Sequence, residues 1–310
     1  RTPLSNYRKQ NKGGRGVSGA TTSEDDYIEM VFQATNHNHL MFFTDLGRAY
    51  SVRVFDLPEG QRTAKGRSIS NVIPLQENEK VTVILPVKEF QENHYIFMCT
   101  KYGTVKKTPL NEFSKIRSTG IIALNLRDDD KLVAARITDG NAEIIIGSRN
   151  GQACRFVESD VRSMGRTAAG VMGIRLRADD YVVSMVAVDS PEQQILVVGD
   201  KGYGKRTKVS EFRMTNRGSK GVISMKTTSK TGNVIGLLDV MESDEIVVMT
   251  QNAVIIRQAV KNISLLGRNT QGVRLLRLDK NDKIADITVI PRDEDEDENI
   301  DTQEQVPENP

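Results

Sequence analysis

The sequence predicts an all-β chain in which six four-stranded blades form a closed ring, followed by an acidic tail. The first observation is a module of about 50 residues that recurs six times. The second is that each module holds short apolar runs rich in Val and Ile between Gly, Asn and Asp clusters, which is the pattern of strands and turns. The third is that no long segment has the 3.6-residue period of a helix. Short strands at a fixed repeat favour a ring of blades.

The first element of each module is an apolar strand that ends at a tight turn. It reads LMFFTDLG, YIFMCTKYG, EIIIGSRNG and QILVVGDKG, with turn glycines Gly47, Gly103, Gly151 and Gly202. A fifth copy, EIVVMTQNA, has Ala253 at the glycine position. Because glycine adopts a positive φ without steric cost, these turns predict hairpins.

A basic strand follows each turn, as in VKKTPLNEF from Val105 and GKRTKVSEF from Gly204. The opening segment RTPLSNY is the same strand without its turn. Tyr7, Phe113 and Phe212 share one position after this strand, and their regularity indicates blade core. A platform for stacking nucleic-acid bases is the alternative interpretation.

Each module later contains a glycine followed by a short apolar run. The copies begin at Gly16, Gly66, Gly120, Gly170, Gly221 and Gly272, at intervals of 50 to 54 residues. RTPLSNY lacks an upstream strand, and the last run, IADITVI, lacks a downstream one. We therefore expect the two ends of the chain to complete one blade and close the ring.

The net charge of +2 hides two opposite contributions. Residues 1–292 carry +11, whereas residues 293–310 carry nine acidic residues and no basic one. The six halves that contain the turn and the basic strand carry between +2 and +5 each, +21 in all. A ring of such modules presents a basic band, which predicts a polyanionic partner. The tail is expected to be disordered and to compete for the band.

Several classes of protein are not supported. No apolar run approaches the roughly 20 residues of a membrane helix, and no secretory signal is present. The chain opens on Arg1, so we interpret it as a fragment of a longer cytoplasmic protein. Cys99 and Cys154 lie in strand-like segments without a CxxC partner, which predicts buried, reduced thiols.

Two motifs suggest nucleotide binding but lack the required context. Residues 199–206, GDKGYGKR, resemble a P-loop, yet Arg206 stands where the Mg²⁺-binding Ser or Thr is required and a strand follows instead of a helix. Residues 14–19 match GxGxxG without the flanking strand and helix. We find no nucleophile–base pair and no metal-ligand spacing, so no catalytic residue, metal or cofactor is expected in this chain.

Residues 10–16, QNKGGRG, differ from every other module. Three glycines let the backbone approach a phosphate closely, and two basic side chains add charge; a flexible linker is the alternative. This box resembles Gln-Arg-Arg-Gly-Gly-Lys-Gly, which marks the C-terminal domain of the DNA gyrase A protein. The match covers Gln10, Gly13, Gly14 and Gly16, with Lys12 and Arg15 as basic-for-basic exchanges. Asn11 departs from the family's Arg.

The resemblance extends over residues 1–290, through HLMFFTDLGRAYSVRVFDLP, TAKGRSISNVIPL, VTVILPV and GKRTKVSEFR. The related topoisomerase IV protein has similar blades but lacks the box, so the box favours gyrase. The resemblance implies a six-bladed β-pinwheel, a propeller-like ring whose blades exchange strands. Residues 1–292 would form this DNA-binding domain, and residues 293–310 the acidic tail.

The resemblance also implies the function. Duplex DNA would wrap without sequence preference around the basic rim, with positive handedness, so that the holoenzyme introduces negative supercoils. The catalytic tyrosine and the ATPase, with ATP and Mg²⁺, belong to parts outside this chain. The implied partners are duplex DNA, the rest of the gyrase A protein and the gyrase B protein in an A2B2 assembly. The isolated domain is expected to be monomeric and, in the bacterial cytoplasm, associated with the nucleoid.

The predicted contacts are phosphate clamps, because wrapping without sequence preference needs charge neutralisation rather than base readout. They are Gln10, Lys12, Gly13, Gly14, Arg15, Gly16, Arg48, Arg53, Lys65, Arg67, Lys106, Lys107, Arg149, Arg155, Lys205, Arg206, Lys208, Arg257 and Lys261. The alternatives are the topoisomerase IV domain, a protein-binding propeller and an enzyme built on a propeller. Kelch-type propellers expect a Trp in each repeat, and this chain has none.

Overall fold

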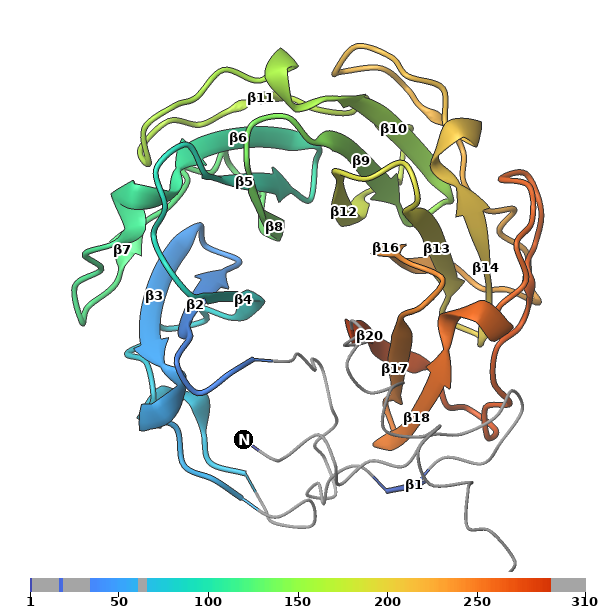
Figure 1. The fold of residues 1–310 in the computed structure, drawn as a ribbon, viewed down its shortest axis with the longest axis horizontal. Helices are drawn as coiled ribbons and strands as arrows, with labels where there is room; N and C mark the ends of the chain where they lie inside the picture. Colours follow the sequence, from blue (N-terminus) through green and yellow to red (C-terminus); the bar gives the residue numbers. More distant parts are fainter. Residues whose placement is uncertain (2–16, 19–33, 61–65, 291–310) are drawn as a thin grey trace, which may run out of the picture.

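The computed structural model describes residue 1 and residues 17–18, 34–60 and 66–290. These residues form five four-stranded antiparallel sheets, which we call blades A to E in chain order. The blades follow one another along an arc, with strands β4, β8, β12, β16 and β20 on the inside (Figure 1). No helix in this part of the chain is long and apolar enough to cross a membrane.

Every blade has the same order from the inside outwards: an inner strand, the two strands of a hairpin, and a two-residue outer strand. Blade A contains β4 (Val81–Val87), β2 (His39–Thr44), β3 (Arg48–Arg53) and β7 (Ile121–Ile122). Blade B contains β8 (Leu132–Thr138), β5 (Tyr95–Thr100), β6 (Thr104–Pro109) and β11 (Val171–Met172). Blade C contains β12 (Val182–Val188), β9 (Glu143–Ser148), β10 (Gln152–Val157) and β15 (Val222–Ile223).

Blade D contains β16 (Val234–Val240), β13 (Gln194–Gly199), β14 (Tyr203–Lys208) and β19 (Val273–Arg274). Blade E contains β20 (Ile284–Ile290), β17 (Glu245–Thr250), β18 (Val254–Ala259) and β1 (Val17–Ser18). A short 3₁₀ helix follows the second hairpin strand of each blade: η2 (Val54–Asp56), η4 (Leu110–Phe113), η5 (Glu158–Asp160), η6 (Val209–Glu211) and η7 (Val260–Asn262).

Neighbouring blades exchange their outer strands. In blades A to D the outer strand comes from the next module along the chain: β7, for example, pairs with β3 of blade A and not with the hairpin of blade B. In blade E the outer strand comes from the start of the chain, where Val17 lies opposite Ile255. The prediction that both ends of the chain share one blade is confirmed, since β1 and β20 belong to the same sheet. The joining segment is Val17–Ser18, whereas residues 2–7 of the RTPLSNY segment lie outside the described residues.

The repeated glycines precede the exchanged strands because the backbone crosses a neighbouring strand there. Gly272 has a φ of +75°, and a Cβ at this position would lie 2.6 Å from the carbonyl oxygen of Gly204. The predicted turn glycines also have positive φ values, such as +84° at Gly202. Ala253 adopts +62° at the same turn position, which confirms that EIVVMTQNA is a fifth copy of the turn.

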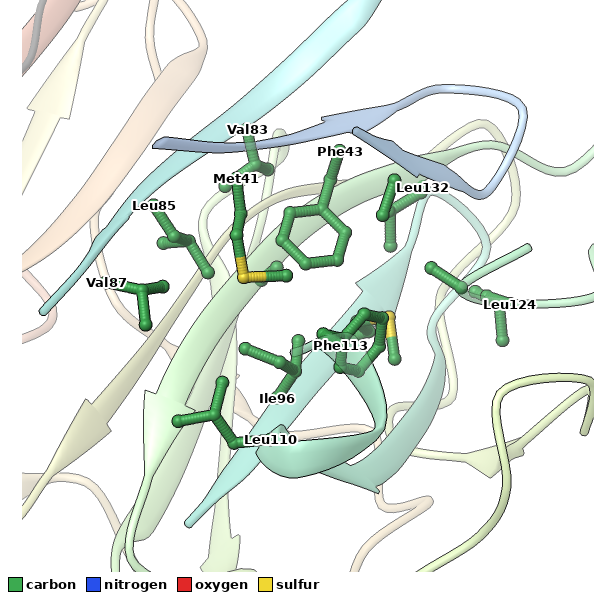
Figure 2. Packing of buried hydrophobic residues seen from close by; sticks show 14 residues of the cluster. Met41, Phe43, Val83, Leu85, Val87, Ile96, Leu110, Phe113, Leu124 and Leu132 are labelled. Atoms are coloured by element: carbon green, nitrogen blue, oxygen red, sulfur yellow. The ribbon is translucent and has the colours of Figure 1, made fainter. Parts of the chain in front are cut away.

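The hydrophobic core lies between blades rather than inside one. Between blades A and B, Met41 and Phe43 pack against Ile96, Leu110 and Phe113 (Figure 2). The rings of Phe43 and Phe113 meet edge to face, with centroids 5.9 Å apart. Similar clusters lie between blades B and C, C and D, and D and E, so both faces of blades B, C and D are covered by neighbouring blades.

Two further core predictions are confirmed. Phe113 and Phe212 are fully buried, as their shared repeat position indicates. Cys99 and Cys154 are free and buried, and burial raises the pKa of the Cys99 thiol. Tyr7 lies outside the described residues.

The prediction of six blades is wrong for the described part of the chain, which forms five. Gly66 was counted as one of the six glycines that precede a short apolar run, but Ile69–Asn71, which follows it, is a 3₁₀ helix (η3). The Ser68 side chain accepts a hydrogen bond from Ser70 N, and Ile73 N donates to Ile69 O at 3.0 Å, so the backbone bonds locally. The QNKGGRG box, Lys65 and the acidic tail lie outside the described residues.

Candidate nucleic-acid interface

Lys106 on β6 and Lys205 on β14 hold equivalent positions in blades B and D, and both are 0% exposed. The Nζ atom of Lys106 donates to the carbonyl oxygens of Ala123 at 2.7 Å and Ala168 at 3.2 Å. It also donates to the carbonyl oxygen of Arg166. The lysine thereby fixes the loop that leads into β11, the outer strand of its own blade.

Lys205 has the same arrangement in blade D. Its Nζ donates to the carbonyl oxygen of Gly267 at 2.6 Å and to Thr270 Oγ1 at 3.0 Å. It also donates to the carbonyl oxygen of Arg268, in the loop that leads into β19. Burial lowers the pKa of both Lys106 and Lys205 to about 8, because it penalises the charged form.

Arg155 and Arg206 hold the strand position that follows the one held by Lys106 and Lys205 in their own strands. Each donates hydrogen bonds to the following blade. Arg155 on β10 donates to the carbonyl oxygens of Val209 at 2.9 Å and Phe212 at 2.8 Å, around η6 of blade D. Arg206 on β14 is 5% exposed, and its Nε donates to Ile263 O at 2.7 Å, beyond η7 of blade E. The basic strands thus join blades to one another.

Lys107, Arg48 and Arg257 also have partners within the protein. Lys107 Nζ lies 3.9 Å from the buried carboxylate of Glu158 and 5.0 Å from the centroid of the Tyr95 ring. Arg257 forms an ion pair with Glu245.

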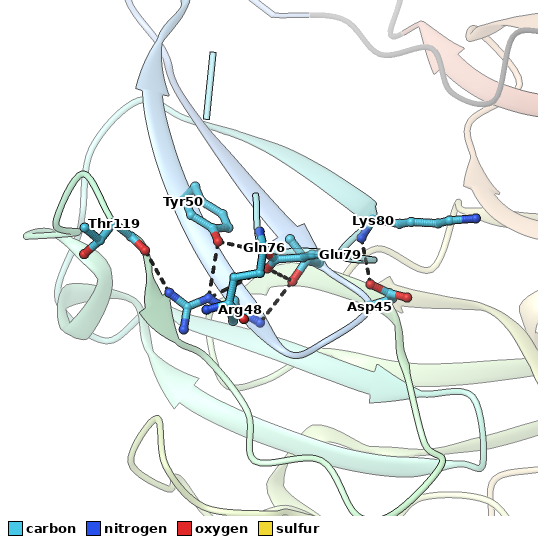
Figure 3. Close-up of polar contacts among 8 residues, drawn as sticks. Asp45, Arg48, Tyr50, Gln76, Glu79, Lys80 and Thr119 are labelled. Carbon is cyan, nitrogen blue, oxygen red and sulfur yellow. Dashed lines mark hydrogen bonds and ion pairs between the residues drawn. The ribbon is translucent and has the colours of Figure 1, made fainter. Parts of the chain in front are cut away.

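Arg48 belongs to a network around the buried Glu79 carboxylate (Figure 3). Arg48 Nη2 donates to Thr119 O at 2.8 Å, next to the start of the exchanged strand β7. Glu79 accepts hydrogen bonds from the Tyr50 hydroxyl at 2.8 Å and from Thr44 Oγ1 at 2.7 Å. Burial is the main reason why the pKa of the Tyr50 hydroxyl is raised.

The predicted contacts differ in how far they reach solvent. Lys106, Lys107, Lys205 and Arg206 are buried. Their role as phosphate clamps stays a prediction, and their burial among protein acceptors does not favour it. Arg48, Arg155 and Arg257 are largely buried and already bonded, so they are structural groups before they are DNA contacts. A buried cation needs hydrogen-bond acceptors or carboxylates within the protein, and these side chains have such partners.

The remaining predicted contacts fall into three groups. Arg53, Arg67, Lys208 and Lys261 are exposed and stay predictions. Arg149 is partly buried and lies over the Tyr181 ring, 5.7 Å from its centroid. Gln10, Lys12, Gly13, Gly14, Arg15, Gly16 and Lys65 lie outside the described residues.

A further set of basic residues, exposed or half-buried, lies in the segments that lead into the outer strands. We call these segments, residues 114–120, 162–170, 213–221 and 264–272, the rim loops. Together they contain eight basic residues and no Asp or Glu: Lys115, Arg117, Arg162, Arg166, Arg213, Arg217, Lys220 and Arg268. The rim loops run directly into the outer strands, and Figure 1 places β7 and β11 outside β3 and β6.

Three rim-loop arginines, 51 residues apart, link successive outer strands. Arg166 Nη1 donates to Ile122 O at 3.2 Å, in β7. Arg217 Nη1 donates to Met172 O at 3.1 Å, in β11. Arg268 Nη1 donates at 3.2 Å to a carbonyl of β15. A guanidinium carries five N–H donors, so each arginine is oriented by the protein and keeps donors for a phosphate.

None of the eight rim-loop cations was among the predicted contacts. The sequence does contain a signal for them, since acidic residues are absent from the four segments that end at Gly120, Gly170, Gly221 and Gly272. We predicted contacts in the basic strands because Lys and Arg lie closer together there in the sequence than in the rim loops. Among the described residues no cluster of three or more His, Cys, Asp or Glu could hold a metal ion.

The fold and this surface define a class of protein: a β-propeller of the pinwheel type, with exchanged outer strands and a basic rim. The chain belongs to the family described as DNA gyrase C-terminal domain, beta-propeller. The family model matches residues 1–32, 38–88, 94–139, 142–189, 193–240 and 244–291. The first of these six segments falls almost entirely outside the described residues. The resemblance inferred from the sequence is confirmed.

Similar sequences are DNA gyrase A proteins. The chain is 44% identical to that of Salmonella typhimurium over 296 residues, covering 96% of this chain and 34% of the relative. It is 43% identical to that of Escherichia coli over 300 residues, covering 97% and 34%. The chain thus spans about a third of the length of the curated relatives it matches.

Two solved structures resemble the fold. A structure of the DNA gyrase A C-terminal domain matches with a TM-score of 0.83 and 27% identity, covering 93% of this chain and 94% of that one. A crystal structure of the C-terminal domain of DNA topoisomerase IV matches with a TM-score of 0.72 and 29% identity, covering 82% and 80%.

Proposed function

We propose that this chain binds and wraps duplex DNA around its rim loops, as an accessory domain of a DNA gyrase. The observation that carries the proposal is the set of eight rim-loop cations without a single acidic neighbour in the same segments. Cations repeated along an arc can follow a curved phosphate backbone, and the counterions released on binding supply affinity that does not depend on sequence.

Bending DNA costs on the order of 1–6 kcal/mol for a 40–90° bend, so a wrapping surface needs contacts at several points along the duplex. The rim meets this need, because Arg166, Arg217 and Arg268 recur once per module and are held in place by backbone carbonyls. Positioned arginines lose less conformational freedom on binding than free side chains.

The roles beyond this chain rest on the family. We propose that wrapping presents a neighbouring DNA segment to the rest of the gyrase A protein, which works with gyrase B, ATP and Mg²⁺ to introduce negative supercoils. The same proposal includes four further points. They are positive handedness of the wrap, a role for Lys12 and Arg15 in the QNKGGRG box, competition by the acidic tail, and a place near the nucleoid.

The test is a topology assay. The chain is added to relaxed circular DNA, the circle is treated with a nicking–closing topoisomerase, and the change in linking number is measured. The rim variant carries Arg162→Gln, Arg213→Gln and Lys220→Gln, all exposed rim-loop residues. The matched control carries Arg127→Gln, Arg177→Gln and Lys280→Gln, which are exposed in turns that precede inner strands.

We expect the unmodified chain to shift the linking number, the rim variant to lose most of the shift, and the control to keep it. Equal effects of both triple variants would show that net charge alone matters and would contradict a rim path. An unmodified chain that leaves the linking number unchanged at low salt would sink the wrapping proposal.

A further inference from the structure

A second basic site lies at one end of the central channel and is separate from the rim. The inner strands enclose a cavity of about 910 Å³, which continues into an adjoining cavity of about 620 Å³; Thr82, Val133, Ile235 and Ala285 line both. The charged residues that line the smaller cavity define what we call the channel mouth: Asp45, Lys80, Lys101, Lys131, Asp200 and Lys283.

The backbone holds these residues in place at the start of the inner strands. Lys101 N donates to Lys131 O at 2.7 Å within blade B. Leu132 N donates to Asp45 O at 3.2 Å, which joins blade B to blade A, and Ile284 N donates to Asp200 O at 3.1 Å, which joins blade E to blade D. The lysines therefore project from positions fixed by bonds within and between blades.

The channel mouth has an excess of positive charge. Asp45 pairs with Lys131 at 2.8 Å, and Asp200 pairs with Lys283 at 3.5 Å. Within the described residues, no carboxylate lies within ion-pair distance of the other two ammonium groups, those of Lys80 and Lys101.

Lys80 and Lys101 are both directed by their surroundings. Lys101 Nζ lies 5.2 Å from the centroid of the Tyr181 ring and 5.6 Å from that of Tyr102. The backbone N–H of Lys80 donates to Asp45 Oδ1 at 2.9 Å, while its side chain extends away from the Glu79 network (Figure 3). Two lysines without a carboxylate partner thus line a cavity that also contains two lysines paired with Asp.

We propose that the channel mouth binds a polyphosphate chain, inorganic or that of a nucleotide, a ligand distinct from the DNA proposed for the rim. A volume of about 620 Å³ lies within the range of small-molecule sites and is too small for a duplex. Ammonium groups bind phosphate as point charges. The apolar residues Val81, Leu132 and Ile284 line the same cavity, and surroundings of low dielectric strengthen such pairs.

The test is isothermal titration calorimetry of the 310-residue chain with tripolyphosphate and, in a second arm, with a nucleoside triphosphate. The mouth variant carries Lys80→Gln and Lys101→Gln. The matched control carries Lys115→Gln and Lys220→Gln, two exposed rim-loop lysines, so it removes the same charge. Thermal melting of each variant verifies that the fold is kept. Lys80→Gln alone, at an exposed position, serves as a second variant if the double variant melts early.

We expect one saturable site for tripolyphosphate, a loss of affinity of about tenfold or more in the mouth variant, and less than about twofold in the control, tenfold being 1.4 kcal/mol. Equal affinity for both ligands identifies the phosphate chain alone as the recognised group, and tighter nucleotide binding adds a base contact in the channel. Absence of saturable binding, or equal weakening by both double variants, would overturn the proposal.

Discussion

At the scale of the residue, the most informative side chains are the buried lysines. A lysine in a basic strand does not reveal from the sequence whether its side chain points into the protein or into solvent. Lys106 and Lys205 stand in basic strands and were expected to contact DNA, yet each lies at 0% exposure among carbonyl oxygens. Alternation along a strand separates inside from outside only when one face of a sheet meets water. Blades B and D have a neighbouring blade on each face, so the central positions of β6 and β14 are buried in both registers.

The burial of Lys205 predicts a pH dependence of stability. Its folded-state pKa is about 8, below the 10.5 of a free lysine. Between these values the unfolded chain binds the proton and the folded chain does not, so this lysine makes stability rise from pH 8 to pH 10.5. At 1.36 kcal/mol per pKa unit the gain is at most about 3 kcal/mol. Below pH 8 its contribution is constant.

Urea unfolding of the unmodified chain and of Lys205→Met, measured from pH 7 to pH 10.5, isolates this term because other titrating groups are common to both. The difference in unfolding free energy should grow in favour of the unmodified chain above pH 8. A difference that stays constant across the range would mean that the Lys205 ammonium keeps its proton in the folded chain.

At the scale of the element, the sequence predicts the strands and turns well, but it predicts less well which strands pair with one another. The turn glycines and the copy at Ala253 predict the hairpins, because the positive φ requirement is local. The assignment of each outer strand to a blade is not local: the Gly120 segment could pair with its own hairpin or with the preceding one. Only the family resemblance favoured exchange, and the structure has it between all described blades.

Arg206 tests the idea that basic strands hold blades together. Its guanidinium donates to Ile263 O at 2.7 Å, to Gln194 Oε1 at 3.0 Å and to a carbonyl of η7. Arg206→Met should destabilise the chain by about 2–4 kcal/mol, because it leaves buried acceptors without donors. It should also speed hydrogen exchange in residues 260–266, while DNA affinity stays unchanged below the melting range.

Lys208→Met, at an exposed position of the same strand, is the matched control, because it removes the same charge without breaking a described side-chain bond. We expect less than about 0.5 kcal/mol from it. If both variants slow or weaken DNA binding equally and neither changes exchange in residues 260–266, the basic strand is a DNA contact and the idea that it holds blades together is wrong.

At the scale of the whole molecule, the repeat and the charge sums predicted a basic ring, and the structure moves the exposed charge from the strands to the rim loops. The interval of about 50 residues fixed the blade architecture, because each module needs a neighbour to cover its apolar face. It did not fix the number of blades: the Gly66 copy satisfies the interval yet forms the 3₁₀ helix η3.

If the rim binds DNA through phosphates, its cations set the salt dependence of affinity. Each phosphate contact contributes about 0.9 to the slope of log K against log[salt] on duplex DNA. The triple variant Arg166→Gln, Arg217→Gln, Arg268→Gln should therefore flatten the slope by about 2–3, with similar weakening on unrelated sequences. The double variant Lys106→Met, Lys205→Met should leave the slope unchanged, because those ammonium groups face carbonyls. Gel shifts at several salt concentrations measure both. A slope that responds to the buried pair and not to the rim arginines would place the DNA path elsewhere on the ring, since a phosphate can release counterions only where a cation reaches solvent.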